Sequence, residues 1–432
     1  MAVYIAESLP EAPTAAPTAP RTYAWIVFAL TFGLLLSDYM SRQVLNAVFP
    51  VLKAEWALTD TQLGSLSSIV ALLVGLLTFP LSVVADRWGR VRSVTLMAAL
   101  WSLATLGCAI AANYNQMFAA RFFVGVGEAA YGSVGIALIL SIFPAHLRAT
   151  LSSAFMAGGP VGSVIGMAFG GVIAAQFGWR WAFGAMAAFG LALVVLYALI
   201  VRERRLRAPD GTMPVAQAAR PGLRTIFSGL FSSVSVIAAY VGSGLQLFIM
   251  AAMLAWLPSF LNRYYALPTD RASVGAAIFI LVGAVGMVVC GIVTDRLSRP
   301  APERKWTIAI TYSLTSAALL LVAFRMPPGT AQLVLIGAGM AMVAGTAGPA
   351  GAMVANLTHP SIHATAFATL TLANNLLGLA PGPFVTGLLA DRIELMGAMQ
   401  LVPLAALGAV AAFAVGKRHY ADDLKRIRTL QR

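Results

Sequence analysis

Long apolar segments with few or no charged residues recur along the whole chain. The segment 93–112 contains no charged residue at all. A helix that crosses a lipid bilayer needs about 20 mostly apolar residues, and most helices in the core of a soluble protein are shorter. Charged residues make up only 10% of the chain, whereas a soluble domain carries roughly 25%. The sequence therefore predicts an all-α membrane protein.

Twelve such segments can be marked, which predicts twelve transmembrane helices. They are residues 23–50, 60–85, 93–112, 116–143, 150–176, 181–201, 228–261, 272–294, 306–324, 331–357, 366–390 and 400–416. The polar stretch 202–227 separates the first six from the last six. We therefore expect an N-terminal six-helix half at 23–201 and a C-terminal six-helix half at 228–416, joined by a cytoplasmic linker.

Lysine and arginine gather in the loops on one side of these spans, which sets the orientation under the positive-inside rule. With the N-terminus inside, the basic linker 202–227 and the basic segment 417–432 both fall on the cytoplasmic side. Residues 1–22 are rich in Ala, Pro and Thr, and we expect them to form a disordered cytoplasmic tail, with 417–432 as a second cytoplasmic tail. The prediction is a multi-pass protein of the cell (inner) membrane. Topology also accounts for the net charge of +13, so nucleic acid is not an expected partner.

The most specific motif is "DRWGRVR", in which Gly89 permits a tight turn between two spans. The stretch "ADRWGR" at 85–90 recurs as "TDRLSR" at 294–299, and "RAT" at 148–150 recurs as "HAT" at 363–365. Both pairs have nearly the same spacing and fall in equivalent loops of the two halves. Two related halves of six spans are the plan of major facilitator transporters, whose substrate site lies at mid-membrane depth.

The first of these loops resembles the signature loop of the major facilitator superfamily, Gly-x-x-x-Asp-Arg-x-Gly-Arg, with Ser82 in place of the first Gly. In that family the Asp and Arg form ion pairs that hold the inner gate closed and break during transport. The alternative is a basic loop that only sets the topology. The residues expected to act in gating are Asp86, Arg87, Gly89, Arg90, Arg148, Asp295 and Arg296.

Six further stretches narrow the resemblance. They are "TDTQLGSLSS", "LWSLAT", "RFFVGVGEAA", "FPAHLRAT", "GWRWAF" and "NNLLGLAPGPFVTGLLADR". Together, over about residues 36 to 392, they are similar to the Spinster-like branch of the superfamily, and the related anion–cation symporters share several of them. The Spinster-like resemblance implies lysolipid or sphingolipid-like cargo, whereas the symporter resemblance implies small carboxylates. The residues leave that choice open.

Asp38 and Arg42 stand inside the otherwise apolar stretch "FGLLLSDYMSRQVLNAVF". Residues i and i+4 lie on one face of a helix, and an unpaired charge in hydrocarbon costs about 2.5–3.5 kcal/mol on insertion scales. We therefore expect the two side chains to pair and to face the bundle interior or a wet cavity. The Spinster-like pattern Asn-Tyr-x-Asp-Arg implies a carboxylate at position 41, where this chain has Ser41. A fixed ion pair near the outer membrane face is the alternative.

Arg121 and Glu128 form a second candidate pair, in "ARFFVGVGEAAYG". Two helical turns place them on one face about 10.5 Å apart. Removal from water favours the neutral form of a carboxyl group, which suits a proton carrier. In the Spinster-like family the corresponding Glu is held to couple protons, so Glu128 is the expected proton-coupling residue and Asp38 is its rival. A permanent Glu–Arg tether between the first and fourth spans is the alternative.

No acidic residue lies inside a predicted span of the C-terminal half, so we expect charge-based coupling in the N-terminal half and amide contacts in the other. The residues expected to bind substrate are Arg42, Arg121, Tyr131, Gln246, Asn374 and Asn375.

The chain has no Gly-Lys-Ser/Thr phosphate loop, no metal-ligand spacing and no nucleophile elbow. We therefore predict no enzyme activity, no cofactor and no metal. The predicted function is secondary active, proton-coupled transport of an organic anion or lysolipid-like amphiphile by alternating access, carried out by a monomer in the bilayer. The alternatives are a multidrug or metabolite exporter and a non-transporting receptor on the same fold.

Overall fold

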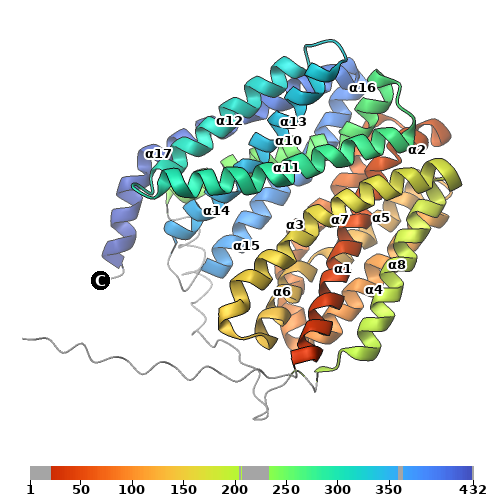
Figure 1. Ribbon diagram of the computed structural model, residues 1–432, viewed down its shortest axis with the longest axis horizontal. Helices are drawn as coiled ribbons and strands as arrows, with labels where there is room; N and C mark the ends of the chain where they lie inside the picture. The colour runs from red at the N-terminus through yellow and green to blue at the C-terminus, as the bar shows by residue number, and fades with distance from the viewer. Residues whose placement is uncertain (1–20, 204–205, 207–232, 359–362, 431–432) are drawn as a thin grey trace, which may run out of the picture.

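The computed structural model describes residues 21–203, 206, 233–358 and 363–430 (Figure 1). All the regular structure in this described part is helical. Before the linker the helices are α1 (Arg21–Ala47), α2 (Phe49–Trp56), α3 (Asp60–Trp88), α4 (Arg90–Ile110), α5 (Tyr114–Glu128), α6 (Tyr131–Ile142), the 3₁₀ turn η1 (Ala145–Leu147), α7 (Arg148–Phe177) and α8 (Trp179–Ile200). After it come α10 (Val234–Tyr265), α11 (Thr269–Ser298), α12 (Arg304–Ala323), α13 (Thr330–Gly345), α14 (Ala347–Asn356), α15 (His363–Asn374), the π-helical turn η4 (Asn375–Leu379), α16 (Pro381–Leu401), the 3₁₀ turn η5 (Val402–Leu404) and α17 (Ala405–Leu430).

Within the described residues, eleven segments are long and apolar enough to cross a membrane. The last of them, Thr365–Lys425, has 61 residues, which is enough for two crossings at about 20 residues each. Its backbone leaves helical geometry at Ile393 and Glu394, where Glu394 has φ 62°. The chain turns there, so this segment supplies the eleventh and twelfth crossings. The predicted all-α membrane fold is confirmed.

Several boundaries differ from the predicted ones. The first predicted span ends early, and a separate helix, α2, follows it from Phe49 with Pro50 in its first turn. The fourth predicted span is interrupted at Ala129–Ala130, between α5 and α6. Helix α1 begins at Arg21, so the last two residues of the predicted tail are helical, and the rest of that tail lies outside the described residues. Most of the linker 202–227 does too, whereas the predicted tail 417–432 continues α17 as helix to Leu430.

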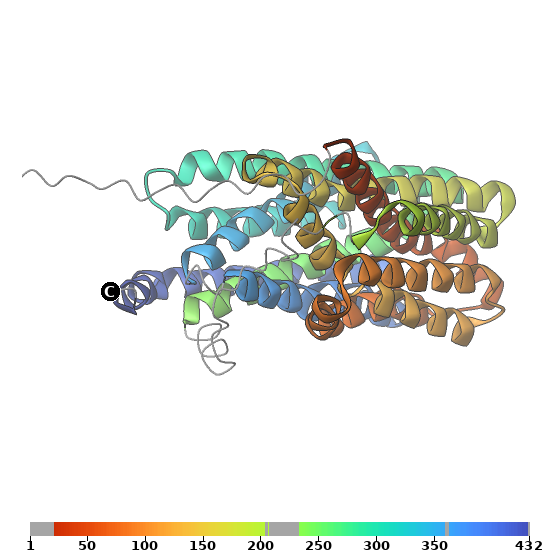
Figure 2. The same ribbon diagram turned by 90° about the horizontal axis from the view of Figure 1, so that it is seen from below.

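Helices α1–α8 pack mainly with one another, and helices α10–α17 do the same, so the molecule consists of two bundles side by side (Figures 1 and 2). The bundles meet where α7 packs on α11 and where α3 packs on α16 and η4. We call the end with the start of α1, Gly89 and the end of α8 the linker end. The opposite end, with α2, the start of α3 and the end of α10, is called the α2 end (Figure 1).

Candidate functional site

A buried cluster of charges joins α1 to α5. Arg42 Nε lies 3.1 Å from Asp38 Oδ1 and 2.8 Å from Glu128 Oε2. The Ser41 hydroxyl donates to Glu128 Oε1 over 3.3 Å. The Glu128 side chain is fully buried and that of Asp38 nearly so. The predicted pairing of Asp38 with Arg42 on one helix face is therefore present, and both carboxylates contact the same guanidinium nitrogen.

Arg121 does not pair with Glu128, contrary to the predicted second pair. Its Nε donates to the Leu66 carbonyl over 3.3 Å and its Nη1 to the Ser41 carbonyl over 3.2 Å. The reason is geometric: two turns along α5 separate the side chains by about 10 Å, while Arg42 reaches Glu128 from the neighbouring helix α1. The ion pair between the first and fourth spans is thus formed by Arg42 and Glu128.

A cavity of about 130 Å³ lies beside this cluster, between the two bundles. It is lined by Tyr39, Arg42, Gln43 and Asn46 of α1, Ser67, Val70 and Ala71 of α3, Arg121 of α5, Ser163 of α7, Ala251 and Leu254 of α10, Leu379 of η4 and Pro383 of α16. All the polar and charged side chains in this wall come from the N-terminal half, and the C-terminal half supplies only apolar ones. Arg42 and Arg121, both predicted to bind substrate, therefore share one cavity.

Three polar side chains that the sequence reasoning missed extend this wall. Asn46 Nδ2 donates to Gln43 Oε1 over 2.9 Å, and the Ser67 hydroxyl donates to Asn46 Oδ1 over 3.1 Å. The signal in the sequence was the pair of amides in an apolar span, directly after Arg42. Among the described residues, no acceptor receives a hydrogen bond from the two terminal nitrogens of Arg42. Its guanidinium carbon lies 5.3 Å from the centre of the Tyr39 ring. These nitrogens are available to a ligand.

The other four residues predicted to bind substrate are absent from the described wall of this cavity. Tyr131 is fully buried, donates to the Thr31 carbonyl over 2.5 Å and packs edge-on against Trp101, so the structure does not support its predicted role. Gln246, Asn374 and Asn375 carry buried amide atoms without hydrogen-bond partners in the described part of the chain, while Asn375 Nδ2 donates to the Thr371 carbonyl over 2.9 Å. Their predicted role stays a prediction.

At the linker end, the predicted turn is present. Gly89 has φ +99°, a backbone conformation that favours glycine, and the Glu203 carboxylate lies close to the position a Cβ would take. Arg90 Nη1 donates to the Ala137 carbonyl over 3.1 Å. The side chain of Asp86 lies outside the described residues. No ion pair joins the described charged residues of the predicted inner gate to any other described residue. These residues are Arg87, Arg90, Arg148, Asp295 and Arg296. Their gating role stays a prediction.

At the α2 end, a network that the sequence reasoning missed joins the two halves. The buried Asp60 carboxylate receives two hydrogen bonds from Arg263, of 2.8 and 2.6 Å, and lies 2.6 Å from Lys53 Nζ. Across the same junction, Asp391 accepts from the backbone N–H groups of Asp60 and Thr61, each over 2.8 Å, and from the Thr61 hydroxyl over 2.6 Å. A carboxylate at the first turn of α3 is stabilised by the free N–H groups there.

Close backbone packing accompanies this network. A Cβ at Gly64 of α3 would collide with the Pro383 carbonyl oxygen, and a Cβ at Gly387 of α16 would collide with the Asp60 carbonyl oxygen. In the described part of the chain, every hydrogen bond and ion pair between the two halves lies at the α2 end, including one from Ser273 to the Ala47 carbonyl. In this structure the two halves are therefore joined at the α2 end.

Residues 31–383 match the Major Facilitator Superfamily. The chain belongs to this superfamily. The match covers most of the chain, and it identifies a transmembrane transporter rather than an enzyme.

Three named relatives indicate which members of the superfamily this chain is similar to. The human protein spinster homolog 1 is 25% identical over 393 residues, which cover 87% of this chain and 74% of the relative. The probable sphingolipid transporter spinster homolog 2 of Arabidopsis thaliana is 24% identical over 394 residues, or 86% and 80% of the two chains. The hexuronate transporter of Bacillus subtilis is 24% identical over 304 residues, or 68% and 71%. The resemblance to Spinster-like members is confirmed.

A solved structure shares the fold. It is the crystal structure of a bacterial homolog of the human lysosomal transporter Spinster, in an inward-facing and unoccupied conformation. It superposes with a TM-score of 0.83 and 20% sequence identity, over 94% of this chain and 99% of that one. The major facilitator fold predicted from the two related halves is confirmed.

Proposed function

We propose that this major facilitator protein is a proton-coupled transporter of a lysolipid-like organic anion. The observation that carries the proposal is the asymmetric wall of the cavity, which has two arginines on one side and only apolar side chains on the other. A phosphate or carboxylate head would bind Arg42 and Arg121, and an apolar chain would lie against Ala251, Leu254 and Leu379. An amphiphile matches both sides of such a wall.

The cavity volume limits what it encloses. Pockets that bury a drug-sized ligand measure roughly 300–1,000 Å³, whereas this one measures about 130 Å³. It therefore holds the head group of a lysolipid but not the whole acyl chain, which would extend between the halves. The sphingolipid transporter among the relatives supports this substrate class. The hexuronate transporter supports the rival class of small organic acids, which would fit the volume entirely.

The buried charges suggest how protons and substrate are linked. Two carboxylates contact one nitrogen of Arg42, and Arg121 lies nearby, so the four groups are neutral together when both carboxyls are ionised. Protonation of Glu128 would leave a net positive charge beside the cavity and would free Arg42 for an anion. Release of the anion would then favour loss of the proton. The cycle moves a proton and an anionic substrate in the same direction.

Alternating access requires that the two halves separate at one end of the molecule while they are joined at the other. The halves are joined at the α2 end by the Asp60 network, which begins seven residues, or about 10 Å, along α3 from Ser67 in the cavity wall. The charged loops at the linker end would form their ion pairs in the other state, in which the halves are joined at the linker end and separated at the α2 end. We propose that the linker end faces the cytoplasm, that the protein lies in the cell membrane and that it works as a monomer. The structure then corresponds to an inward-facing state.

Counterflow in proteoliposomes tests the substrate class. Vesicles loaded with unlabelled candidate substrate should concentrate a trace of labelled lysophospholipid or lysosphingolipid, and hexuronate should give no signal. A receptor without transport activity would give no counterflow with any compound. Counterflow with hexuronate or another short acid alone would contradict the lysolipid proposal and favour the rival class, and accumulation of unrelated uncharged drugs would favour a multidrug exporter.

Arg42→Ala should weaken binding of the lysolipid by about 10- to 100-fold, because a hydrogen bond to a charged group contributes about 1.5–3 kcal/mol. Binding is measured in detergent by equilibrium dialysis, so that a transport defect does not enter. Arg180→Ala is the matched control, since Arg180 makes a surface ion pair of 2.9 Å with Glu55 outside the cavity. If Arg42 is only tied to Asp38, the double variant Asp38→Asn, Arg42→Gln should retain both binding and transport, which would contradict the role proposed for Arg42.

A further inference from the structure

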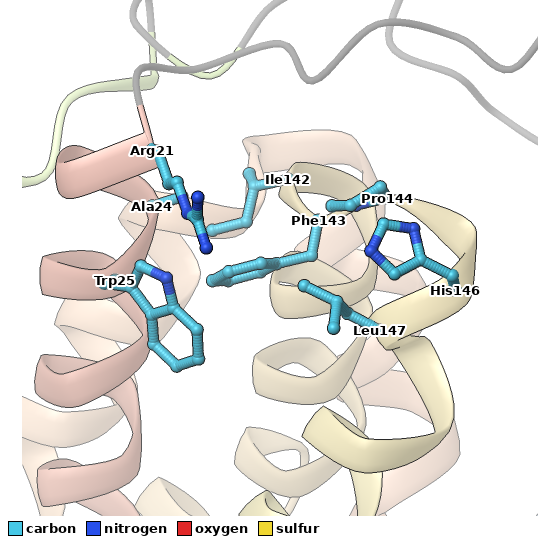
Figure 3. A pocket seen from close by; sticks show the side chains of 8 residues that line it. All are labelled: Arg21, Ala24, Trp25, Ile142, Phe143, Pro144, His146 and Leu147. Atoms are coloured by element: carbon cyan, nitrogen blue, oxygen red, sulfur yellow. The ribbon is translucent and has the colours of Figure 1, made fainter.

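A second cavity, unconnected with the charge cluster, lies at the linker end of the N-terminal half. It measures about 290 Å³ and is enclosed by the first turns of α1 and by the connection from α6 through η1 (Figure 3). Its walls are formed by Arg21, Ala24, Trp25, Ile142, Phe143, Pro144, His146 and Leu147. The rings of Trp25 and Phe143 meet edge-on at 5.2 Å, so the two sides of the cavity are in direct contact at its base.

The cavity combines an apolar base with a basic rim. Figure 3 shows the side chains of Arg21 and His146 on opposite sides of the Phe143 ring. No acidic residue is present among the described residues that line the cavity. Neither Arg21 nor His146 makes a hydrogen bond or an ion pair with another described residue. The rim therefore offers donors to an anion, with no carboxylate of the wall to compete.

The position of the cavity is that of a membrane interface. Trp25 and Ile26 are 44% and 40% exposed, and Figure 2 shows the first turns of α1 (dark red) at the edge of the molecule. Large apolar side chains exposed on a spanning helix face lipid, and Trp is enriched at the level of the head groups. Arg21 is the first residue of the spanning helix, which places the basic rim at head-group depth and the apolar base beside the acyl chains.

We propose that this cavity binds an anionic phospholipid of the adjoining leaflet. The phosphodiester lies between Arg21 and His146, and the upper part of an acyl chain lies against Trp25 and Phe143. The charge of the rim and the apolar base together select a lipid over a free anion, because inorganic phosphate would leave the apolar wall uncovered. The bound lipid ties the start of α1 to the turn between α6 and α7, within one half of the molecule.

Native mass spectrometry of the full chain in detergent tests the proposal with phosphatidylglycerol as the probe. One phosphatidylglycerol should bind to the wild type more tightly than phosphatidylcholine does. Arg21→Gln should raise its dissociation constant roughly fivefold, since an arginine near an anionic membrane surface contributes about 1 kcal/mol. His146→Ala, which removes the ring N–H donor on the other side of the cavity, should raise it as well. Bound lipid should also raise the Tm of the wild type, and the rise should be smaller in Arg21→Gln and in His146→Ala.

Two controls separate this site from general attraction and from misfolding. Arg202→Gln removes an exposed arginine at the same end, outside the cavity, and should bind phosphatidylglycerol as the wild type does. Trp25→Ala keeps the rim charge and should still lose affinity for the lipid, while lysolipid counterflow shows that it is folded. The proposal is overturned if Arg202→Gln weakens binding as much as Arg21→Gln does, if phosphatidylcholine binds equally well, or if inorganic phosphate at millimolar concentration displaces the lipid.

Discussion

Asp60→Asn is expected to shift the transporter away from the state joined at the α2 end. The Asp60 carboxylate is buried and is shared by Arg263 and Lys53, so removing its charge leaves two cations without their partner. Loss of one member of such a pair costs about 2 kcal/mol or more, which changes a two-state equilibrium roughly thirtyfold. Transport should fall steeply, because one half of the alternating cycle becomes rare.

Cysteine accessibility measures this shift. Val70 lines the cavity, and a Val70→Cys variant, with Cys108 and Cys290 replaced by Ala, reports which side the cavity opens to. An impermeant thiol reagent added at the α2 end should label it much faster after Asp60→Asn. Asp270→Asn is the matched control, because Asp270 also stands in the first turn of a spanning helix and makes no ion pair with a described residue. Equal labelling with and without Asp60→Asn would show that the network is not a gate.

Glu128→Gln is expected to abolish accumulation driven by a pH gradient while exchange of substrate for substrate continues. The glutamine cannot release a proton, and exchange does not require a net proton movement. The Glu128 side chain is fully buried and bound to Arg42, so no other described carboxylate except Asp38 can replace it there. Both activities are measured in the same batch of proteoliposomes.

Asp38→Asn distinguishes the two carboxylates, and Glu55→Gln serves as a control for the loss of a glutamate outside the cluster. If Glu128→Gln still concentrates substrate in response to the gradient and Asp38→Asn does not, the coupling role belongs to Asp38. If both variants still respond, neither carboxylate couples protons.

Local patterns explain what could be predicted from the sequence. The number of spans follows from hydropathy alone, because each crossing must bury its own backbone hydrogen bonds in about 20 apolar residues. The contact of Asp38 with Arg42 follows from their separation by four residues, which any helix brings to one face. The motif around Gly89 likewise reflects a turn conformation fixed by a few neighbouring residues.

Contacts between distant helices could not be predicted in this way. Asp60 lies 203 residues from Arg263, and in the sequence it resembles an ordinary helix start, because Thr59 and Gln62 form a capping box around it. The sequence spacing predicts that Glu128 pairs with Arg121 on its own helix, whereas in the structure its partner is Arg42 of α1. Tyr131 lies in the same stretch as Arg121 and Glu128, and its ring packs against Trp101. In each case the deciding neighbour belongs to another helix, and helix packing is not visible in one sequence.

Proton movement driven by lysolipid is the most direct test of coupled transport. Proteoliposomes with a trapped pH-sensitive dye receive lysophospholipid at a concentration that leaves protein-free vesicles sealed, and internal pH is followed. Wild-type vesicles should acidify as the lipid enters, Glu128→Gln vesicles should not, and labelled lysolipid should enter in proportion to the protons. Entry of labelled lysolipid into wild-type vesicles with no change in internal pH would contradict the account.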